Sequence, residues 1–352
     1  MFYNYDAYNL QETWKRRSIA ACLRAGWRYS FYDINDRRIF MKIVFLETKS
    51  IGKDLDLKSF EKLGEVVCYE ETRREQIGER TADADIAVIN KAQMNSETLK
   101  DACRLKLICV TATGTDNLDK KYLEQRKILW KNVAGYSTES VAQHTFALLF
   151  FLLEKLHYYN EYVKSGKYTE ETIFTHLGQP TFELREKTWG IIGMGAIGQR
   201  VAQLADAFGC RVIYYSTSGK NQQKDYTSVS LDTLLRESDV ISVHAPLTEN
   251  TKNLMNRQAF AKMKKTALFI NVGRGPIVEE EALAQALEQD EIGGAGLDVL
   301  STEPMAADCP LFRIKDSSKL IITPHIAWAT REARGRLMEK VWQQIRDFLE
   351  EK

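Results

Sequence analysis

The chain has 352 residues and a formal net charge of +1, with 49 Lys and Arg against 48 Asp and Glu. This length suits two domains of about 100 to 200 residues each. A charge so close to zero gives no long-range attraction to nucleic acid or to an anionic membrane, so we expect neither as a partner. The longest apolar run, residues 146–153, is far shorter than the roughly 20 residues of a membrane span.

Six cysteines are scattered along the chain without the paired spacing of metal ligands. We therefore expect reduced thiols, no disulfide, no bound metal and a cytoplasmic location.

The first 40 residues differ from the rest of the chain. They are rich in aromatic and basic residues and follow neither a helical nor a strand period. Acidic residues interrupt the basic character that a transit peptide needs. We interpret residues 1–40 as an N-terminal extension of unknown role, which would be a translated leader or the result of a misplaced start.

From Met41 onward, short apolar runs alternate with helical patterns, which is typical of βαβ units and a parallel sheet. The first predicted strands cover residues 42–46, 66–69, 86–90 and 107–111. A long, largely buried helix is predicted over residues 137–155, with Ser137 as its N-cap. This helix would lead from the first domain into a second one.

A loop-rich stretch, residues 164–180, precedes a second series of predicted strands at 188–192, 211–215, 240–244, 268–272 and 295–299. The last helix, residues 331–350, has an apolar face that would pack back on the first domain. We therefore predict an α/β protein of two doubly wound, Rossmann-like domains with a cleft between them. Residues 41–138 plus 326–352 would form the substrate domain, and residues 139–325 the dinucleotide-binding domain.

A glycine-rich turn follows the predicted strand 188–192 and opens a helix. Gly193 permits a tight turn, Gly195 lets backbone amides approach a pyrophosphate, and Gly198 lets the helix lie close to the sheet. The helix N-terminus then faces the anion. This order of strand, glycine turn and helix predicts a dinucleotide site that comprises Gly193, Met194, Gly195, Ala196, Ile197 and Gly198.

The end of the next strand decides which dinucleotide is bound. NAD-specific sites place an Asp or Glu there to hold the ribose 2′-hydroxyl. This chain has Ser216 and, after further small polar residues, Lys220. Hydroxyl groups and a lysine could bind a 2′-phosphate. Lys220 could equally be a solvated loop residue, so the sequence leaves both NAD(H) and NADP(H) as possible cofactors.

Further candidate residues follow the other strands of this domain, where a doubly wound sheet offers its ligand crevice. Arg274 lies between two glycines, so its planar guanidinium is free to bind a carboxylate. His325 follows shortly after an apolar run, and a histidine is a natural proton donor near neutral pH. Each of these residues also has a structural interpretation: Arg274 as a surface turn residue, His325 as a structural histidine and Pro246 as a strand terminator. Together they favour a site, which also includes His244, Pro246, Val272, Gly273, Asp298 and Glu303.

From Met41 to its C-terminus the chain resembles the D-isomer-specific 2-hydroxyacid dehydrogenase family. The resemblance rests on four segments: the glycine turn 193–198, residues 271–275, residues 296–299 with Glu303-Pro304, and residues 323–325. Together these motifs are highly specific. The helix segment 139–145 and the loop 113–117 also resemble the family's domain-linking helix and its substrate-carboxylate loop.

The resemblance implies a role for each matching residue. Arg274 would bind the carboxylate of a 2-keto acid, His325 would donate a proton, and Glu303 would hold His325 and favour its charged form. Asp298 would lie beside the nicotinamide. The substrate would also contact Lys91, Gly114 and Thr115.

The implied reaction is the NAD(P)-dependent reduction of a small 2-keto acid to the D-2-hydroxy acid, with hydroxypyruvate, glyoxylate or pyruvate as substrate. The enzyme would be a homodimer. An alternative function is a dinucleotide-sensing binding module of the corepressor type, and a third is a methyltransferase. The chain departs from the family's pattern at Ser216, where an acidic residue is missing, and at Glu186, where the family often has glycine.

Overall fold

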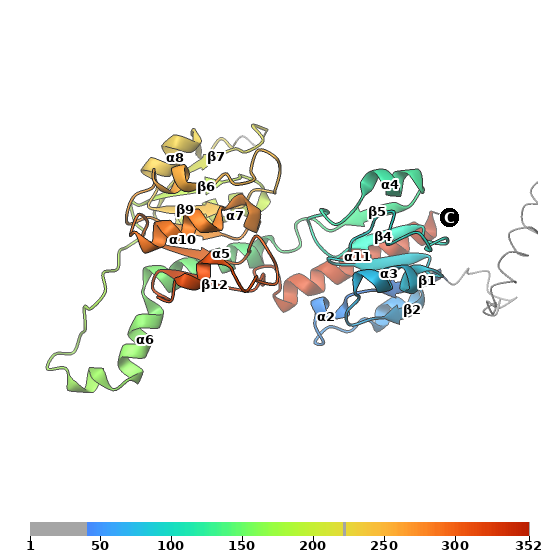
Figure 1. Ribbon diagram of the computed structural model, residues 1–352, viewed down its shortest axis with the longest axis horizontal. Coiled ribbons are helices and arrows are strands. Elements are labelled where there is room, and N and C mark those ends of the chain that lie inside the picture. The colour runs from blue at the N-terminus through green and yellow to red at the C-terminus, as the bar shows by residue number, and fades with distance from the viewer. Residues whose placement is uncertain (1–40, 221–222, 352) are drawn as a thin grey trace, which may run out of the picture. The chain divides into compact units, whose positions relative to one another are not determined.

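The computed structural model describes residues 41–220 and 223–351, so the N-terminal extension expected over residues 1–40 lies outside the described residues. The described chain contains one five-stranded and one seven-stranded sheet, and all strand pairs in both are parallel (Figure 1). No helix among the described residues is both long enough and apolar enough to cross a membrane. The predicted α/β class is confirmed.

The first sheet has the strand order β2-β1-β3-β4-β5. The chain therefore reverses direction between β1 and β3, and such switch points are where doubly wound sheets bind ligands. Four of its strands match the predicted ones, and β5 was missed. The strands are β1 (Met41–Phe45), β2 (Gly64–Cys68), β3 (Ile86–Ile89), β4 (Leu107–Val110) and β5 (Leu129–Asn132).

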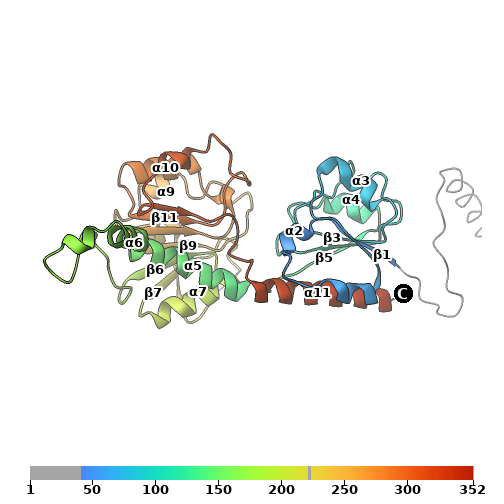
Figure 2. The ribbon, with the colours of Figure 1, turned by 90° about the horizontal axis from the view of Figure 1, so that it is seen from below.

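Short helices connect these strands, namely α2 (Thr48–Ile51), η1 (Lys58–Lys62), η2 (Arg74–Gln76), α3 (Ile77–Thr81) and α4 (Lys120–Gln125). The C-terminal helix α11 (Arg331–Glu350) has the predicted bounds, and Thr330 caps its N-terminus. Leu337 and Val341 of α11 share a buried core with Ile43 and Phe45 of β1. The last helix thus packs on the first sheet (Figure 2), as its apolar periodicity predicted.

The second sheet has the order β12-β11-β10-β9-β6-β7-β8. Its first six strands in chain order follow the 3-2-1-4-5-6 pattern of dinucleotide-binding sheets. Ile192 at the end of β6 pairs with Val243 at the end of β9, so the loops after these strands leave the switch point side by side. The strands are β6 (Thr188–Ile192), β7 (Arg211–Tyr215), β8 (Thr227–Ser228), β9 (Val240–Val243), β10 (Leu268–Asn271), β11 (Gly294–Leu297) and β12 (Leu320–Ile322).

Helix α5 (Thr138–Leu153) packs on this second sheet, since its apolar residues share a core with β6, β7 and β10. Ser137 is its N-cap residue but makes no side-chain capping bond, contrary to prediction. Glu139 supplies the negative charge in the first turn. The other helices are α7 (Ala196–Ala207), α8 (Leu231–Glu237), α9 (Arg257–Phe260), η4 (Gly275–Ile277), α10 (Glu280–Glu288) and η5 (Pro310–Arg313).

The stretch predicted as loop-rich, residues 164–180, contains one short helix, and a helix that was not predicted precedes it. Helix α6 (Leu156–Lys164) follows α5 and contains no buried residue, and η3 (Lys167–Glu170) follows it. We call residues 156–180 the arm. Several of its apolar side chains are exposed, and the most exposed are Ile173, Phe174 and Leu177.

Candidate active site

The glycine turn after β6 is built by close backbone approaches. Gly193 has φ +95°, and a Cβ atom there would lie 2.7 Å from the backbone nitrogen of Ala245, in the loop after β9. A Cβ on Gly198 would lie 2.2 Å from the carbonyl oxygen of Gly193. Side chains at these two positions would push the turn off the neighbouring loop and off α7. The compact turn keeps the first amides of α7 directed at the switch point, which suits a pyrophosphate.

The remaining residues of the turn leave room at the helix N-terminus. A Cβ on Gly195, the N-cap residue of α7, would meet no described atom within 4 Å. Met194 is buried and Ala196 is exposed. Ile197 is partly buried and packs against the core that α5 shares with the second sheet.

Two buried polar atoms near this turn have no hydrogen-bond partner among the described residues: Ser216 Oγ, after β7, and His244 Nδ1, after β9. Nε2 of His244 lies 2.9 Å from Ser242 Oγ, and burial lowers the pKa of His244 to about 3, so this ring is neutral. Unpaired buried polar groups are costly, and a bound molecule with hydroxyl and amide groups would satisfy them. Both atoms therefore fit a dinucleotide that crosses the sheet at the glycine turn.

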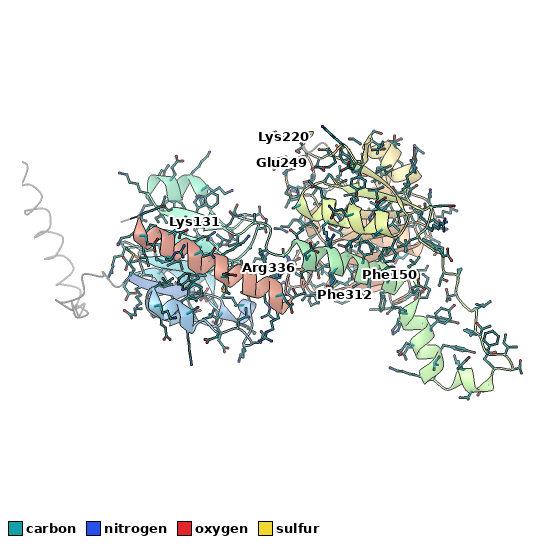
Figure 3. The ribbon with its side chains drawn as sticks, turned by 180° about the vertical axis from the view of Figure 1, so that it is seen from behind. Lys131, Phe150, Lys220, Glu249, Phe312 and Arg336 are labelled. Atoms are coloured by element: carbon teal, nitrogen blue, oxygen red, sulfur yellow. The ribbon has the colours of Figure 1, made fainter. Side chains whose placement is uncertain are left out.

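Other predicted cofactor residues are less constrained. Lys220 is exposed, and its ammonium forms no ion pair with a residue that the structure describes (Figure 3). Pro246 is also exposed, in a turn where its carbonyl accepts a hydrogen bond from Thr251. Val272 is buried, and the amide of Gly273 donates to Asn271 Oδ1.

Arg274 lies in the loop just after β10, and neighbouring residues fix the position of its guanidinium. One of its guanidinium nitrogens, Nη1, donates to the carbonyl oxygen of Gly273 at 2.8 Å. Its Nε lies 3.8 Å from Asp116 Oδ2, in the loop after β4. A Cβ on Gly114 of that loop would lie 2.3 Å from Nη2. The structure thus brings Arg274 together with the loop predicted to bind a carboxylate.

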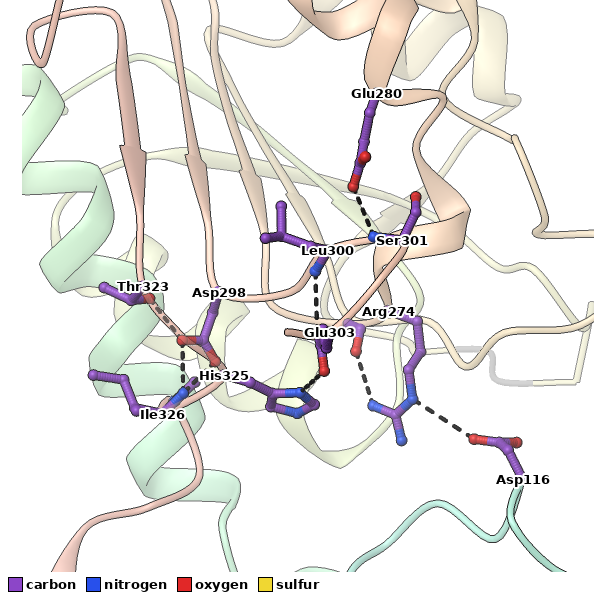
Figure 4. A network of polar contacts seen from close by, with 12 residues as sticks. Asp116, Arg274, Glu280, Asp298, Leu300, Ser301, Glu303, Thr323, His325 and Ile326 are labelled. Atoms are coloured by element: carbon purple, nitrogen blue, oxygen red, sulfur yellow. Dashed lines mark hydrogen bonds and ion pairs between the residues drawn. The ribbon is translucent and has the colours of Figure 1, made fainter. Parts of the chain in front are cut away.

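Glu303 and His325 form a directly hydrogen-bonded pair (Figure 4). Nδ1 of His325 lies 2.6 Å from Glu303 Oε2, while Oε1 accepts a hydrogen bond from the Leu300 amide. Burial favours the neutral form of the Glu303 carboxyl, but the hydrogen bond and charge of His325, the Leu300 amide and the Lys91 charge together outweigh this effect, so the pKa of Glu303 lies below the usual value. An ionised carboxylate on Nδ1 leaves Nε2 of His325 free for proton transfer.

Asp298, after β11, is almost fully buried, and the loop after β12 surrounds its carboxylate. Oδ1 accepts hydrogen bonds from Thr323 Oγ1 and from the amide of Ile326, and Oδ2 accepts one from the amide of Ala327. His325, between these donors, has φ +56°. Sequence reasoning placed Asp298 beside the cofactor and did not foresee that it holds the histidine loop.

The loop that carries Lys91 is fixed by a carboxylate that sequence reasoning missed. Glu47, directly after β1, accepts hydrogen bonds from three successive amides, those of Asn90, Lys91 and Ala92. The Lys91 ammonium helps to lower the pKa of Glu303, which links this loop to the Glu303 and His325 pair. The signal available in the sequence was a lone carboxylate at the end of a buried strand, at the switch point of the first sheet.

Thr115 belongs to the loop that approaches Arg274. Its carbonyl oxygen accepts a hydrogen bond from the Leu118 amide, which closes the turn. Met94, shortly after Lys91, pairs with Leu118, so the Lys91 loop and the Gly114 loop are joined by a bridge.

Residues 146–327 match the model of the NAD-binding domain of the D-isomer specific 2-hydroxyacid dehydrogenases. The chain belongs to this family. It is 38% identical to a glycerate dehydrogenase of Methylorubrum extorquens over 88% of this chain and 96% of that protein. It is 37% identical to a hydroxypyruvate reductase of Blautia hydrogenotrophica over 88% of this chain and 97% of that protein.

Among solved structures, an acyclic imino acid reductase in complex with NADPH and D-Arg superposes with a TM-score of 0.79 at 30% identity, covering 89% of this chain and 98% of that one. The chain is therefore an NAD(P)-dependent oxidoreductase with a cofactor of the NAD(H) or NADP(H) type. Neither the corepressor nor the methyltransferase alternative gains support from these similarities.

Proposed function

We propose that this enzyme reduces a small 2-keto acid to the corresponding D-2-hydroxy acid, with His325 as the proton donor. The observation that carries the proposal is the 2.6 Å contact between His325 Nδ1 and Glu303 Oε2, at the carboxyl end of a dinucleotide-type sheet that also presents Arg274. An imidazole, a carboxylate and a guanidinium in this arrangement suit the reduction of a carbonyl next to a carboxylate.

Arg274 binds the substrate carboxylate in this proposal. The contact of its Nε with Asp116 at 3.8 Å is the support, since the guanidinium already attracts a carboxylate group in this position. The amides near Gly114 and Thr115 face the same substrate group. The two loops then hold the 2-keto carbon in one orientation, which lowers the entropic cost of reaction.

A nicotinamide bound at this site would supply the hydride. Nε2 of His325 donates its proton to the carbonyl oxygen as the alcohol forms, and Glu303 stabilises the protonated imidazole through Nδ1. In the reverse direction the neutral imidazole accepts the hydroxyl proton. One proton and one hydride convert the 2-keto acid to the 2-hydroxy acid, so the reaction balances.

The domain assignment is part of the proposal. Residues 41–138 plus 326–352 form the substrate domain, supported by the packing of α11 on the first sheet, and residues 139–325 form the dinucleotide-binding domain. In the latter, Ser216, Lys220, His244, Pro246, Val272, Gly273 and Asp298 join the glycine turn in the cofactor site. The absence of a carboxylate after β7 supports the use of NADPH as well as NADH.

The proposed substrate is hydroxypyruvate or glyoxylate. The printed names of the two relatives support this choice, and so does Lys91, a cation whose charge reaches Glu303. A small or polar substituent on the carbonyl carbon suits such a site better than a branched apolar one does. The five described cysteines are all free, which supports a reducing, cytoplasmic location.

We also propose that two copies pair through the arm. Ile173, Phe174 and Leu177 are 61%, 90% and 87% exposed, which is unusual for apolar side chains so close in sequence. At the base of the arm, Phe150 of α5 and Phe208 lie in contact and line a pocket of about 450 Å³ together with Phe182. The exposed side chains of one copy would fill the pocket of the other.

Mass measurement by light scattering tests this pairing. Phe174→Asp should convert a dimer to a monomer, whereas the control Phe312→Asp, at an exposed phenylalanine of η5 (Figure 3), should leave the dimer intact. A monomeric wild-type protein would refute the pairing.

The first test of the reaction is the loss of reduced-nicotinamide absorbance with NADH and NADPH separately, against glyoxylate, hydroxypyruvate, pyruvate, phenylpyruvate and 2-ketoisocaproate. We expect oxidation with hydroxypyruvate or glyoxylate. His325→Ala should abolish turnover and leave cofactor binding near normal, because the substitution removes the proton donor and spares the glycine turn. Turnover at the wild-type rate in this variant would exclude the mechanism.

A further inference from the structure

Helix α5 contacts the loop that carries His325 at two places. Ser140 Oγ donates a hydrogen bond to the carbonyl oxygen of Ala327 at 2.5 Å. One helical turn later, His144 Nε2 lies 2.9 Å from Thr323 Oγ1. Residues 140 and 144 are on the same helix face, so α5 holds the loop on both sides of His325.

The direction of the hydrogen bonds follows from counting protons. Thr323 Oγ1 carries one hydrogen, and it lies 2.6 Å from Asp298 Oδ1, an oxygen that can only accept as a carboxylate. The hydroxyl therefore donates to Asp298 and must accept from His144. Nε2 of His144 is the donor, and the hydrogen bonds run from α5 through Thr323 into the buried carboxylate.

We call this chain of hydrogen bonds, from His144 through Thr323 to Asp298, the relay. It ends at the backbone next to the proton donor. The Asp298 carboxylate receives Thr323 Oγ1, the Ile326 amide and the Ala327 amide, which flank His325 on both sides (Figure 4). His325 itself has φ +56°, in the left-handed region that few residues with a Cβ adopt. Removal of one donor to Asp298 would let this strained turn relax.

His144 is suited to donate without bringing a charge. Its side chain is 19% exposed and that of Asp298 1%, with 3.5 Å between Nε2 and Oδ1. Burial lowers the pKa of His144, against the opposing effect of Asp298, so the ring is neutral near neutral pH. A neutral imidazole protonated at Nε2 still makes the hydrogen bond.

We propose that His144 is a positioning residue for the reaction: through Thr323 and Asp298 it fixes the loop that presents His325. The proposal rests on the proposed role of His325 as proton donor. It assigns to α5 a function beyond packing on the second sheet, since the helix also determines where the proton is delivered.

Substitutions of His144 and Thr323, the first two members of the relay, test the proposal. His144→Phe keeps a ring but removes the donor, and His144→Gln places an amide nitrogen the same number of bonds from Cα. Thr323→Val removes the hydroxyl at nearly constant shape. We expect roughly tenfold lower kcat in His144→Phe and Thr323→Val, with the KM for the keto acid within about twofold, and recovery of most of the loss in His144→Gln.

The double variant separates a relay from two independent effects. If both residues act along one chain of hydrogen bonds, His144→Phe/Thr323→Val should lose about as much kcat as Thr323→Val alone. The matched control is Thr145→Val, which removes a fully buried hydroxyl of α5 that donates to the carbonyl oxygen of Val141 and does not contact the loop. This control should keep the wild-type kcat.

Wild-type kcat in His144→Phe, or a double variant whose loss equals the product of the two single losses, would overturn the proposal. A second measurement is independent of turnover: amide hydrogen exchange of residues 322–328 should be faster in His144→Phe and Thr323→Val than in the wild type and His144→Gln. Unchanged exchange in both variants would also overturn the relay. If the wild type reduces no keto acid, the proposed function fails, and the exchange experiment still decides whether the relay holds the loop.

Discussion

Nδ1 of His325 lies 2.6 Å from Glu303 Oε2, and the same carboxylate is held from its other oxygen by the amide of Leu300. The backbone contact fixes the orientation of the carboxylate, and the hydrogen bond to His325 contributes to keeping its pKa below the usual value. Glu303 is therefore ionised over the pH range in which an imidazole titrates. A fixed negative charge on one ring nitrogen stabilises the protonated form of the donor.

The first prediction concerns the pH dependence of reduction. Glu303→Gln removes the negative charge that favours protonated His325, and reduction needs the protonated form. The kcat for reduction should therefore fall, and most on the alkaline side of the profile. The measurement is kcat for keto acid reduction between pH 5 and 9. The exposed Glu65→Gln, on β2, is the control and should leave the profile in place, whereas an unchanged profile in Glu303→Gln would separate Glu303 from the proton donor.

The second prediction concerns substrate binding. Arg274→Lys keeps the charge but loses the planar pair of donors, so the KM for the keto acid should rise roughly ten- to hundredfold. The Kd for NADPH, measured by fluorescence, should change little. Arg313→Lys, in a surface cluster with Glu281 and Glu288, is a matched control. A wild-type KM in Arg274→Lys would remove this residue from the substrate site.

Much of the fold was predictable because apolar runs at strand length mark buried parallel strands directly. The elements that were missed lack this signal. β5 lies at the edge of its sheet, with Leu129 exposed and no fully buried residue, and β8 has only two residues. Helix α6 has no buried residue, so its sequence lacks the apolar periodicity that predicts a helix.

The candidate site was predictable to the extent that its residues follow strands. Arg274, Glu303 and His325 each come after a strand of one parallel sheet, and parallel strands end at one edge. Contacts between distant segments were not predictable in this way. The hydrogen bonds of Glu47 to the amides of the loop after β3, and of His144 to Thr323, depend on packing that no local pattern encodes.

The third prediction concerns the choice of cofactor. Ser216 lies at the end of β7, and its buried hydroxyl lacks a partner among the described residues. Ser216→Asp would place a carboxylate where a 2′-phosphate has to fit. The KM for NADPH should rise at least about tenfold, while the KM for NADH should stay equal or fall, because the carboxylate binds a 2′-hydroxyl and repels a phosphate.

Steady-state kinetics with both cofactors measures this change. Ser218→Asp, two residues further and exposed, is the control for an added charge in the same turn. It should shift the ratio of the two KM values much less than Ser216→Asp does. Equal shifts in both variants would indicate a general charge effect and would exclude Ser216 as the ribose contact.

The fourth prediction concerns stability at Glu186, where the resemblance to the family led us to expect glycine. Glu186 has φ +66°, and its amide donates to the carbonyl oxygen of Gly209. A left-handed conformation costs a residue with a Cβ roughly 1 to 2 kcal/mol, whereas glycine adopts it freely. Glu186→Gly removes this strain but adds entropy to the unfolded chain, which leaves a net gain of about 1 kcal/mol in the free energy of unfolding.

Thermal unfolding of the two proteins measures the gain, which should raise the Tm by roughly 1 to 3 °C. Glu183→Gly is the matched control, because it removes the same charge three residues earlier, at a position whose φ is not positive. There the glycine only increases the freedom of the unfolded chain, so the control should be no more stable than the wild type. Equal stabilisation by both substitutions would mean that loss of negative charge, and not relief of backbone strain at Glu186, is the cause.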